Sequence, residues 1–232
     1  MSPPALSSPV SLPIVVAITG ASGAVYAARL LEALLSQGHE VHLTLSESGI
    51  AVIRQELQVN VGLRGEQLAG ALTAADQLLG VSAESAWSSQ RAAAQMAAGL
   101  LTVHHHQDYF TPIASGSFLT RGMVVCPCSG STLSGIAHAA SQNLIQRAAE
   151  VHLKEHRKLI VVPRETPVSG LQLDNMQRLA QAGAVVLPAS PGWYHGVTSL
   201  LDLVDFIVAR ILDQLGIENQ AMQRWGAEQP PA

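Results

Sequence analysis

The residues whose types and spacing first suggest chemistry form a glycine-rich turn near the start of the chain. This turn, Thr19–Ala24 (Thr-Gly-Ala-Ser-Gly-Ala), follows the apolar run 14–18. Its small residues let backbone N–H groups approach a ligand closely, and the partial positive charge of a helix start favours an anion. We therefore expect an anion site here, with phosphate as the anion. The structural alternative is a tight strand–helix turn without a ligand, because the P-loop lysine and the Gly-x-Gly-x-x-Gly spacing are both missing.

A second turn of small polar residues repeats this arrangement further along the chain. The segment Ser129–Thr132 follows the apolar run 122–128 and precedes a helical pattern that begins at Leu133. Its hydroxyls and helix-start N–H groups suit a phosphate monoester. These hydroxyls also have a purely structural interpretation, since serine commonly caps a helix.

Cations, one carboxylate and one aromatic residue complete the set of candidate groups. Lys154 lies in a predicted helix, Arg164 and Glu165 follow a predicted strand, and Tyr194 lies in a Pro-Gly turn. Lys and Arg together suit an anion that gains charge as it leaves, and an aromatic ring beside them can stabilise a cationic fragment. A structural ion pair and a packing tyrosine are the alternatives.

The elements that must position these groups alternate between strand and helix. Strands are predicted at 14–18, 40–45, 122–128, 158–163 and 183–188, and helices at 25–35, 49–57, 133–137, 148–156, 175–181 and 200–215. This order predicts a single α/β domain with a doubly wound, flavodoxin-like or Rossmann-like parallel sheet. The ends of parallel strands share one edge of the sheet, where ligands bind. We therefore expect the candidate groups to converge there, with Ser22, Ser46, Ser129, Arg164 and Tyr194 just past strand ends.

The segment 60–102 gives a weaker pattern, rich in Ala and Ser, for which we expect irregular structure with one or two short helices. The triplet His104–His106 follows it. Successive side chains point in different directions on any regular element, so a solvated loop or strand edge is favoured over a metal site.

Composition limits the class of protein. The 232 residues carry a net charge of −4 and only 13% charged residues. The low charge favours an oligomer that hides part of its surface, and the acidic balance argues against nucleic-acid binding. The sequence has no apolar run of about 18 residues, so a membrane span is not expected.

The chain ends and the cysteines complete this outline. We expect a flexible leader over 1–13, one domain over 14–217 and a polar tail over 218–232. The leader lacks the features of a signal peptide, and Cys126 and Cys128 suit neither a disulfide framework nor a Cys-x-x-Cys site. From these two features we expect a cytoplasmic location. Cys128 as a nucleophile is a further alternative, although a buried, proline-flanked cysteine is more often structural.

Several motifs, in order, resemble the UbiX-type flavin prenyltransferases over 14–225. They are Thr-Gly-Ala-Ser-Gly-Ala at 19–24, Ala-Ser-Gly-Ser at 114–117, Cys-Pro-Cys-Ser at 126–129, Arg-Ala-Ala-Glu-Val-x-Leu-Lys-Glu at 147–155, Val-Pro-Arg-Glu-Thr-Pro at 162–167, Asn-Met at 175–176, Pro-Gly-Trp-Tyr-His at 191–195 and Ala-Arg-Ile-Leu-Asp-Gln-Leu-Gly at 209–216. The resemblance implies transfer of a dimethylallyl group from dimethylallyl phosphate to N5 and C6 of reduced flavin mononucleotide (FMN), without a metal. The product, prenylated FMN, serves a UbiD-type decarboxylase. The family's usual assembly is a dodecamer with sites at subunit contacts, so the resemblance also implies that Lys154, Tyr194 or Arg210 reaches a neighbour's site.

The resemblance also implies roles for individual residues. Flavin binding is implied for Gly20, Ala21, Ser22, Ser46, Ser129, Gly130, Ser131, Thr132 and Arg164. Dimethylallyl phosphate binding is implied for Lys154, Glu165, Tyr194 and Arg210, and Tyr109 stands where some relatives stack a tryptophan near the flavin. Glu56 with Ser22 is implied in proton movement during ring closure, and Glu165 in proton exchange with the departing phosphate, beside Lys154.

The sequence departs from the family's pattern at a few positions. Many relatives have His where Gln172 stands and Phe where Trp193 stands, and Gly130 and Ser131 also differ from some relatives.

Two rival functions remain. An FMN-dependent decarboxylase on the same fold is one rival, but the signature of that group is absent from the sequence. A non-catalytic flavin carrier is the other, and it would not need the cluster of Lys154, Arg164, Glu165 and Arg210.

Overall fold

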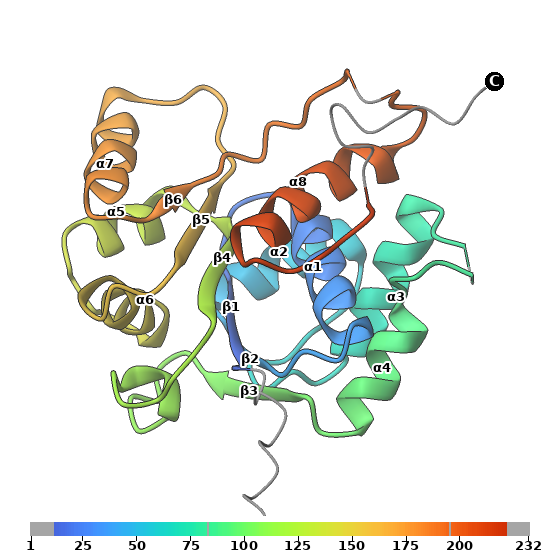
Figure 1. Cartoon of the computed structure of the whole chain (residues 1–232), viewed down its shortest axis with the longest axis horizontal. Helices are drawn as coiled ribbons and strands as arrows, with labels where there is room; N and C mark the ends of the chain where they lie inside the picture. The colour runs from blue at the N-terminus through green and yellow to red at the C-terminus, as the bar shows by residue number, and fades with distance from the viewer. Residues whose placement is uncertain (1–11, 83, 195, 222–232) are drawn as a thin grey trace, which may run out of the picture.

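A six-stranded, fully parallel sheet forms the centre of the molecule (Figure 1). The computed structural model describes residues 12–82, 84–194 and 196–221. The strand order is β3-β2-β1-β4-β5-β6. The strands are β1 (Ile14–Ile18), β2 (Val41–Leu45), β3 (Leu101–His105), β4 (Gly122–Cys128), β5 (Leu159–Pro163) and β6 (Val185–Val186). The expected doubly wound α/β sheet is confirmed.

The order of the strands reverses between β1 and β4. The chain runs from β1 outward to β2 and β3, and then returns to place β4 on the other side of β1. The loops after β1 and β4 therefore leave the sheet in opposite directions, and in sheets of this kind ligands bind in the crevice between two such loops. We call this side, where all the strands end, the carboxyl edge, and the opposite side the amino edge.

Helices cover both faces of the sheet (Figure 1). One face is covered by α1 (Ala24–Ser36), α2 (Glu47–Leu57), α3 (Leu68–Leu79), α4 (Ser89–Ala97) and α8 (Leu200–Gln214). The other is covered by α5 (Gly130–Ala137), α6 (Leu144–Lys154) and α7 (Gly170–Gln181), with a short 3₁₀ turn at Pro112–Ala114.

Side chains of one strand alternate between two separate cores. Ile14, Val16 and Ile18 of β1 pack in the core under α1, whereas Val15 and Ala17 pack in the core under α5 and α6. All five are at most 2% exposed. The unbroken apolar run follows directly from this burial on both faces.

The differences from expectation lie mostly in weakly patterned segments. The segment 60–102 holds two helices, as expected, but also the start of the edge strand β3, which takes in His104 and His105. That triplet is not solvated throughout, because His104 and His106 are buried. The helices α6 and α7 begin earlier than predicted, at Leu144 and Gly170, and β6 has only two residues.

The predicted chain ends lie mostly outside the described residues, which begin at Leu12 and stop at Ala221. Where the structure does describe the predicted leader, Pro13 is buried and its carbonyl accepts a hydrogen bond from the N–H of Arg121. No described helix has the length and apolar character required to cross a bilayer.

Candidate functional site

The first glycine turn binds a carboxylate of the chain itself. Glu56, in the last turn of α2, accepts hydrogen bonds from the N–H of Gly23 at 3.0 Å and from the N–H of Ala24 at 2.7 Å. These groups form the amino end of α1, where a negative charge is stabilised. The anion expected at this turn is therefore, at these two N–H groups, Glu56 and not a phosphate.

Arg164 approaches the same turn from the end of β5. Its Nε donates a hydrogen bond to the carbonyl oxygen of Ser22 at 3.1 Å. Since the β1 and β5 ends flank β4, this contact spans the crevice at the carboxyl edge. The turn is thus held on one side by a cation and on the other by a carboxylate.

The glycine turn after β1 and the serine turn after β4 are joined by the buried hydroxyl of Thr19. Thr19 was not among the predicted site residues. Thr19 Oγ1 donates to the carbonyl of Pro127 at 2.8 Å and accepts from the N–H of Ser129 at 2.8 Å. Threonine at the first position of the motif is the only sequence signal for this role. The link fixes the spacing of the turns after β1 and β4.

The second turn offers unpaired donors at a helix start. Ser129 caps α5, and its Oγ accepts from the N–H of Thr132 and approaches the hydroxyls of Ser131 and Thr132. Among the described residues, no hydrogen bond uses the N–H of Gly130 or Ser131. The amino end of α5 therefore retains two free N–H groups and a cluster of hydroxyls, the donor set that suits a phosphate.

A third helix start lies beside the first turn. Ser46 caps α2 by accepting from the N–H of Gly49 at 3.0 Å, and its hydroxyl lies 3.0 Å from that of Ser48. A Cβ added to Gly20 would lie 2.6 Å from Ser48, so glycine is required for this close approach. Gly20, Ala21 and Ser46 thus meet at the carboxyl edge, as predicted.

Glu165 follows Arg164 at the same edge, and its carboxylate has a neutral partner. Gln172, in the first turn of α7, donates from Nε2 to Glu165 Oε2 at 3.2 Å. The same amide nitrogen lies 2.9 Å from where a Cβ on Gly130 would be. Glu165 is therefore placed next to the second turn by α7.

Tyr26 is another residue of this edge that the sequence analysis did not select. Its ring packs against Gly23, where an added Cβ would lie 2.8 Å from Cδ2. Burial raises the pKa of its hydroxyl, the Cys126 thiol raises it further, and Arg164 opposes the rise. A tyrosine one turn into a helix after a glycine turn is the signal that could have found it.

Lys154 does not join this group within one chain. It is the last residue of α6, and β5 begins shortly after it, so it lies toward the amino edge. Its Nζ is 2.8 Å from Oε1 of Glu155. The expectation that it converges with the strand ends is wrong for a single chain, because a helix that leads into a strand ends where that strand begins.

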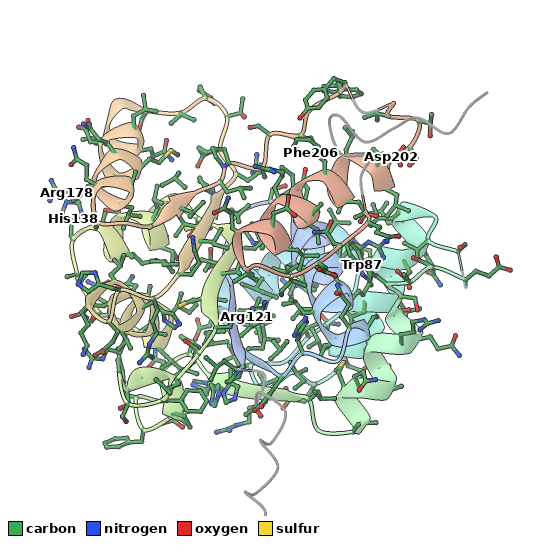
Figure 2. The ribbon with its side chains drawn as sticks, viewed as in Figure 1. Trp87, Arg121, His138, Arg178, Asp202 and Phe206 are labelled. Atoms are coloured by element: carbon green, nitrogen blue, oxygen red, sulfur yellow. The ribbon has the colours of Figure 1, made fainter. Side chains whose placement is uncertain are left out.

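Arg210 and Tyr194 also lie apart from the strand ends. Arg210 is near the end of α8, exposed and 3.2 Å from Asp213, and this helix ends where Arg121 binds the carbonyl of Leu215. Tyr194 stands well past β6 and packs edge-on against Phe206, with ring centroids 6.1 Å apart. Phe206 lies on α8 (Figure 2). Both side chains are exposed outside the crevice.

Tyr109 is exposed and lies in the loop after β3. Its hydroxyl donates to the carbonyl of Ser141 at 3.1 Å, which ties it to the loop between α5 and α6. Within one chain it contacts none of the three helix starts described above.

The two thiols are free and buried. Burial raises the pKa of Cys128 to about 12 and that of Cys126 further still. Neither is a thiolate near neutral pH, so nucleophilic chemistry at Cys128 has no support. Among the described residues, no group of three or more His, Cys, Asp or Glu side chains is arranged to bind a metal ion.

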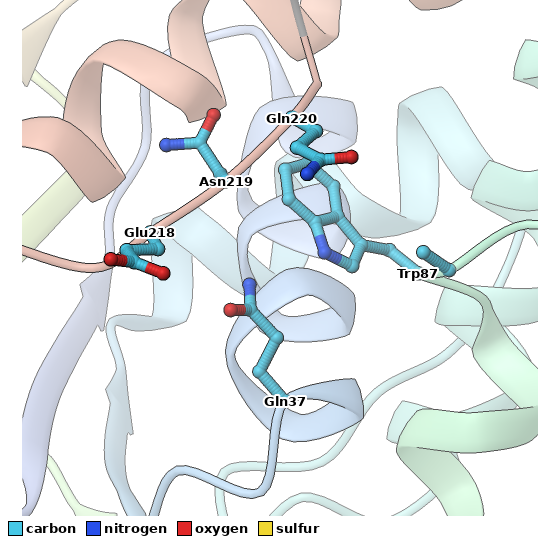
Figure 3. Close-up of a pocket in the computed structure, with 6 residues that line it drawn as sticks. Gln37, Trp87, Glu218, Asn219 and Gln220 are labelled. Atoms are coloured by element: carbon cyan, nitrogen blue, oxygen red, sulfur yellow. The ribbon is translucent and has the colours of Figure 1, made fainter.

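A pocket of about 780 Å³ lies elsewhere, at the end of α1 opposite its glycine turn (Figure 3). Its walls are Gln37, Ala86, Trp87, Glu218, Asn219 and Gln220. None of the predicted site residues lines it.

Comparison with known proteins identifies the family. The family model described as Flavoprotein matches residues 5–212. The flavin prenyltransferase UbiX of Pseudomonas aeruginosa is 45% identical over 215 residues, which cover 93% of this chain and 94% of that protein. The corresponding protein of Halalkalibacterium halodurans is 43% identical over 213 residues, or 92% and 93% of the two chains. The chain belongs to the UbiX family of flavin prenyltransferases.

Solved UbiX structures share the whole fold. The structure of AnUbiX (PadA1) in complex with FMN and dimethylallyl pyrophosphate superimposes with a TM-score of 0.73 at 34% identity, covering 94% of this chain and all of that one. A dodecameric FMN-dependent UbiX-like decarboxylase from Escherichia coli O157:H7 gives a TM-score of 0.72 at 34% identity, covering 93% of this chain and 100% of the other.

Proposed function

We propose that the protein joins a dimethylallyl group from dimethylallyl phosphate to N5 and C6 of reduced FMN, with release of inorganic phosphate. Membership of the UbiX family favours this activity over a decarboxylase or a flavin carrier. The observation that carries the proposal is the pair of turns after β1 and β4, linked by Thr19, with Arg164 reaching across the crevice.

The donor set of the carboxyl edge fits FMN. We assign the flavin to Gly20, Ala21, Ser22 and Ser46 on one wall and to Ser129–Thr132 with Arg164 on the other. The free N–H groups of Gly130 and Ser131 and the hydroxyls around them suit the phosphate of FMN, whereas the start of α1 is already bound to Glu56. FMN supplies the nucleophilic positions at which the new bonds form.

The chain's own side chains then handle the charge and the protons. As the C–O bond of dimethylallyl phosphate breaks, its electron pair leaves with the phosphate, and Arg164 stabilises the added charge. We assign to Glu165 the proton exchange with this phosphate. Oε2 of Glu56 accepts from the N–H groups of both Gly23 and Ala24, whereas Oε1 accepts from Gly23 alone and retains an unused lone pair. We assign to this oxygen, with Ser22, the movement of the protons of ring closure.

Lys154, Tyr194 and Arg210 enter the proposal through a neighbouring subunit. All three lie away from the crevice of their own chain and are exposed. We infer a homo-oligomer, a dodecamer, in which these residues complete the dimethylallyl phosphate site of another copy, and Tyr109 faces the flavin in the same assembly. The exposed side chains of Leu171, Leu173, Trp193 and Leu200 fit such burial.

The product and its location follow from the same chemistry. We propose that prenylated FMN passes to a UbiD-type decarboxylase. Two free, buried thiols fit a reducing compartment, and we propose the cytoplasm.

The release of phosphate tests the proposed reaction. Purified protein, dimethylallyl phosphate and FMN reduced under anaerobic conditions are combined, and inorganic phosphate is followed with time. We expect release that requires both reduced flavin and Arg164, with Arg164→Met inactive and Arg178→Met on the exposed end of α7 fully active. Release at the same rate without flavin, or from both variants, would contradict the proposal.

A further inference from the structure

We propose that Gln172 is a positioning residue for Glu165: its side-chain amide is oriented by the backbone N–H of Ser169 and holds the Glu165 carboxylate toward the crevice. This inference rests on the proposed function of Glu165 in the preceding section.

The orientation of the Gln172 amide is set by the start of α7. Ser169 caps this helix, and its Oγ accepts from the N–H of Gln172 at 3.3 Å, while Gln172 Oε1 accepts from the N–H of Ser169 at 2.9 Å. This is a capping box, in which the third helical residue closes back on the cap. Because the amide oxygen faces the Ser169 N–H, the amide nitrogen must face the other way.

The nitrogen faces Glu165 and the second flavin turn. Gln172 Nε2 donates to Glu165 Oε2 at 3.2 Å. An added Cβ on Gly130 would lie 2.9 Å from this nitrogen, so the absence of a side chain at Gly130 leaves space for the amide group. One oxygen of Glu165 is thereby held, and its other oxygen remains for the leaving phosphate.

A cap alone does not require an amide donor. The second capping box of this protein, at the start of α8, uses Asp202, whose carboxylate accepts from the N–H groups of Thr198 and Ser199 at 2.8 Å each. A carboxylate therefore serves the capping role in this same chain. The cap does not need the side-chain N–H of Gln172, and this group instead donates to Glu165.

An amide suits this use because it does not titrate. It donates one hydrogen bond to Glu165 at any pH, whereas a carboxylate in its place would repel Glu165. Gln172 thus fixes the orientation of Glu165 without adding charge next to the phosphate.

The variant Gln172→Glu separates the two roles of this side chain. Glutamate keeps the acceptor for the Ser169 N–H, so the cap of α7 and the unfolding temperature should remain as in the unaltered protein. It loses the donor to Glu165 and places a second carboxylate there. The matched control, Ser169→Ala, loses the cap hydroxyl but keeps the backbone N–H and Gln172.

Two measurements test the proposal. In the flavin-free full-length protein, ¹³C NMR of labelled glutamate, assigned with Glu165→Gln, should show the side-chain carboxyl signal of Glu165 shifted in Gln172→Glu and unchanged in Ser169→Ala. In the phosphate-release assay, Gln172→Glu should turn over about tenfold more slowly with FMN affinity unchanged, and Ser169→Ala at the normal rate.

The outcomes are distinguishable from those of the proposed function. An unchanged Glu165 carboxyl signal and an unchanged rate in Gln172→Glu would overturn the positioning role. Equal losses in Gln172→Glu and Ser169→Ala would overturn it as well, since they would trace the effect to the cap. If the unaltered protein released no phosphate, the proposed function would fail, while the NMR comparison would still decide whether Gln172 holds Glu165.

Discussion

Arg164 and Glu56 bind opposite ends of one peptide group. The guanidinium of Arg164 donates to the carbonyl of Ser22, and the carboxylate of Glu56 accepts from the N–H of Gly23, the next residue. The peptide dipole thus lies between a cation and an anion that come from β5 and α2. Because Ser22 belongs to this peptide, both charges determine where its hydroxyl stands relative to the crevice.

Replacing Glu56 by glutamine should weaken the first turn of α1. A neutral amide brings no negative charge to this helix start, and its NH2 group cannot accept the hydrogen bond that Oε1 accepts from the N–H of Gly23. We expect the free energy of unfolding to fall by about 1–2 kcal/mol, measured by urea denaturation, together with slower prenyl transfer. The exposed Glu84→Gln is the control; equal stability of the two variants would show that Glu56 does not support the turn.

Mixed oligomers should reveal whether sites are shared between subunits. Lys154→Met and Arg164→Met are each expected to be inactive, because each removes a cation of the proposed site. When both chains are co-expressed, random assembly places an intact Lys154 beside an intact Arg164 of another chain in about a quarter of the sites. Activity near that level is the expected result. Mixed oligomers as inactive as the parents would mean that each site uses one chain only.

The stability of the protein should fall as the pH rises above the acidic range. Glu32 of α1 is 1% exposed and lies 3.1 Å from Arg29, which also binds Asp205. Burial raises the pKa of Glu32 to about 8, Asp76 adds to this rise, and Arg29 opposes it.

The native state therefore holds this proton more tightly than the unfolded chain does. The stabilisation is complete below the unfolded value near 4.5 and is lost as the pH rises through about 8. Between these values the free energy of unfolding should decrease by up to about 1.4 kcal/mol for each pH unit. Glu32→Gln should flatten this dependence in urea denaturation series, and a slope that survives the substitution would assign it to other groups.

The buried thiols should take no part in catalysis. Because burial raises the pKa of Cys128 to about 12, the native protein should resist a thiol reagent at neutral pH, whereas the unfolded chain should react at both cysteines. Cys128→Ala should transfer the prenyl group at the normal rate. Loss of transfer in a variant that still binds FMN would restore Cys128 as a candidate nucleophile.

The sequence was most informative where burial is complete. The strands β1 and β4 were predicted as continuous apolar runs because both of their faces are covered, and the small turns after them marked the carboxyl edge. The strand β3 was missed because it lies at the edge of the sheet, where Thr102 is exposed and His104 is buried, so neither an apolar run nor a regular alternation appears.

The sequence correctly placed only those site residues that directly follow a strand. Ser46, Ser129 and Arg164 follow strands and meet as expected, but Lys154 does not, because its helix leads into a strand and ends at the opposite edge. The contact of Glu56 with the start of α1 depends on the direction in which α2 packs over the sheet. No residue spacing in the sequence indicates this direction.

The mass of the flavin tests the central claim most directly. Reduced FMN is incubated with the protein and dimethylallyl phosphate, or in parallel with the diphosphate, without oxygen, and the flavin is then extracted for mass spectrometry. The account predicts a gain of one C5H8 unit with the protein and none without it. An unmodified flavin with both donors, from protein that binds FMN, would contradict the assignment of the crevice between β1 and β4 as a prenyl transfer site.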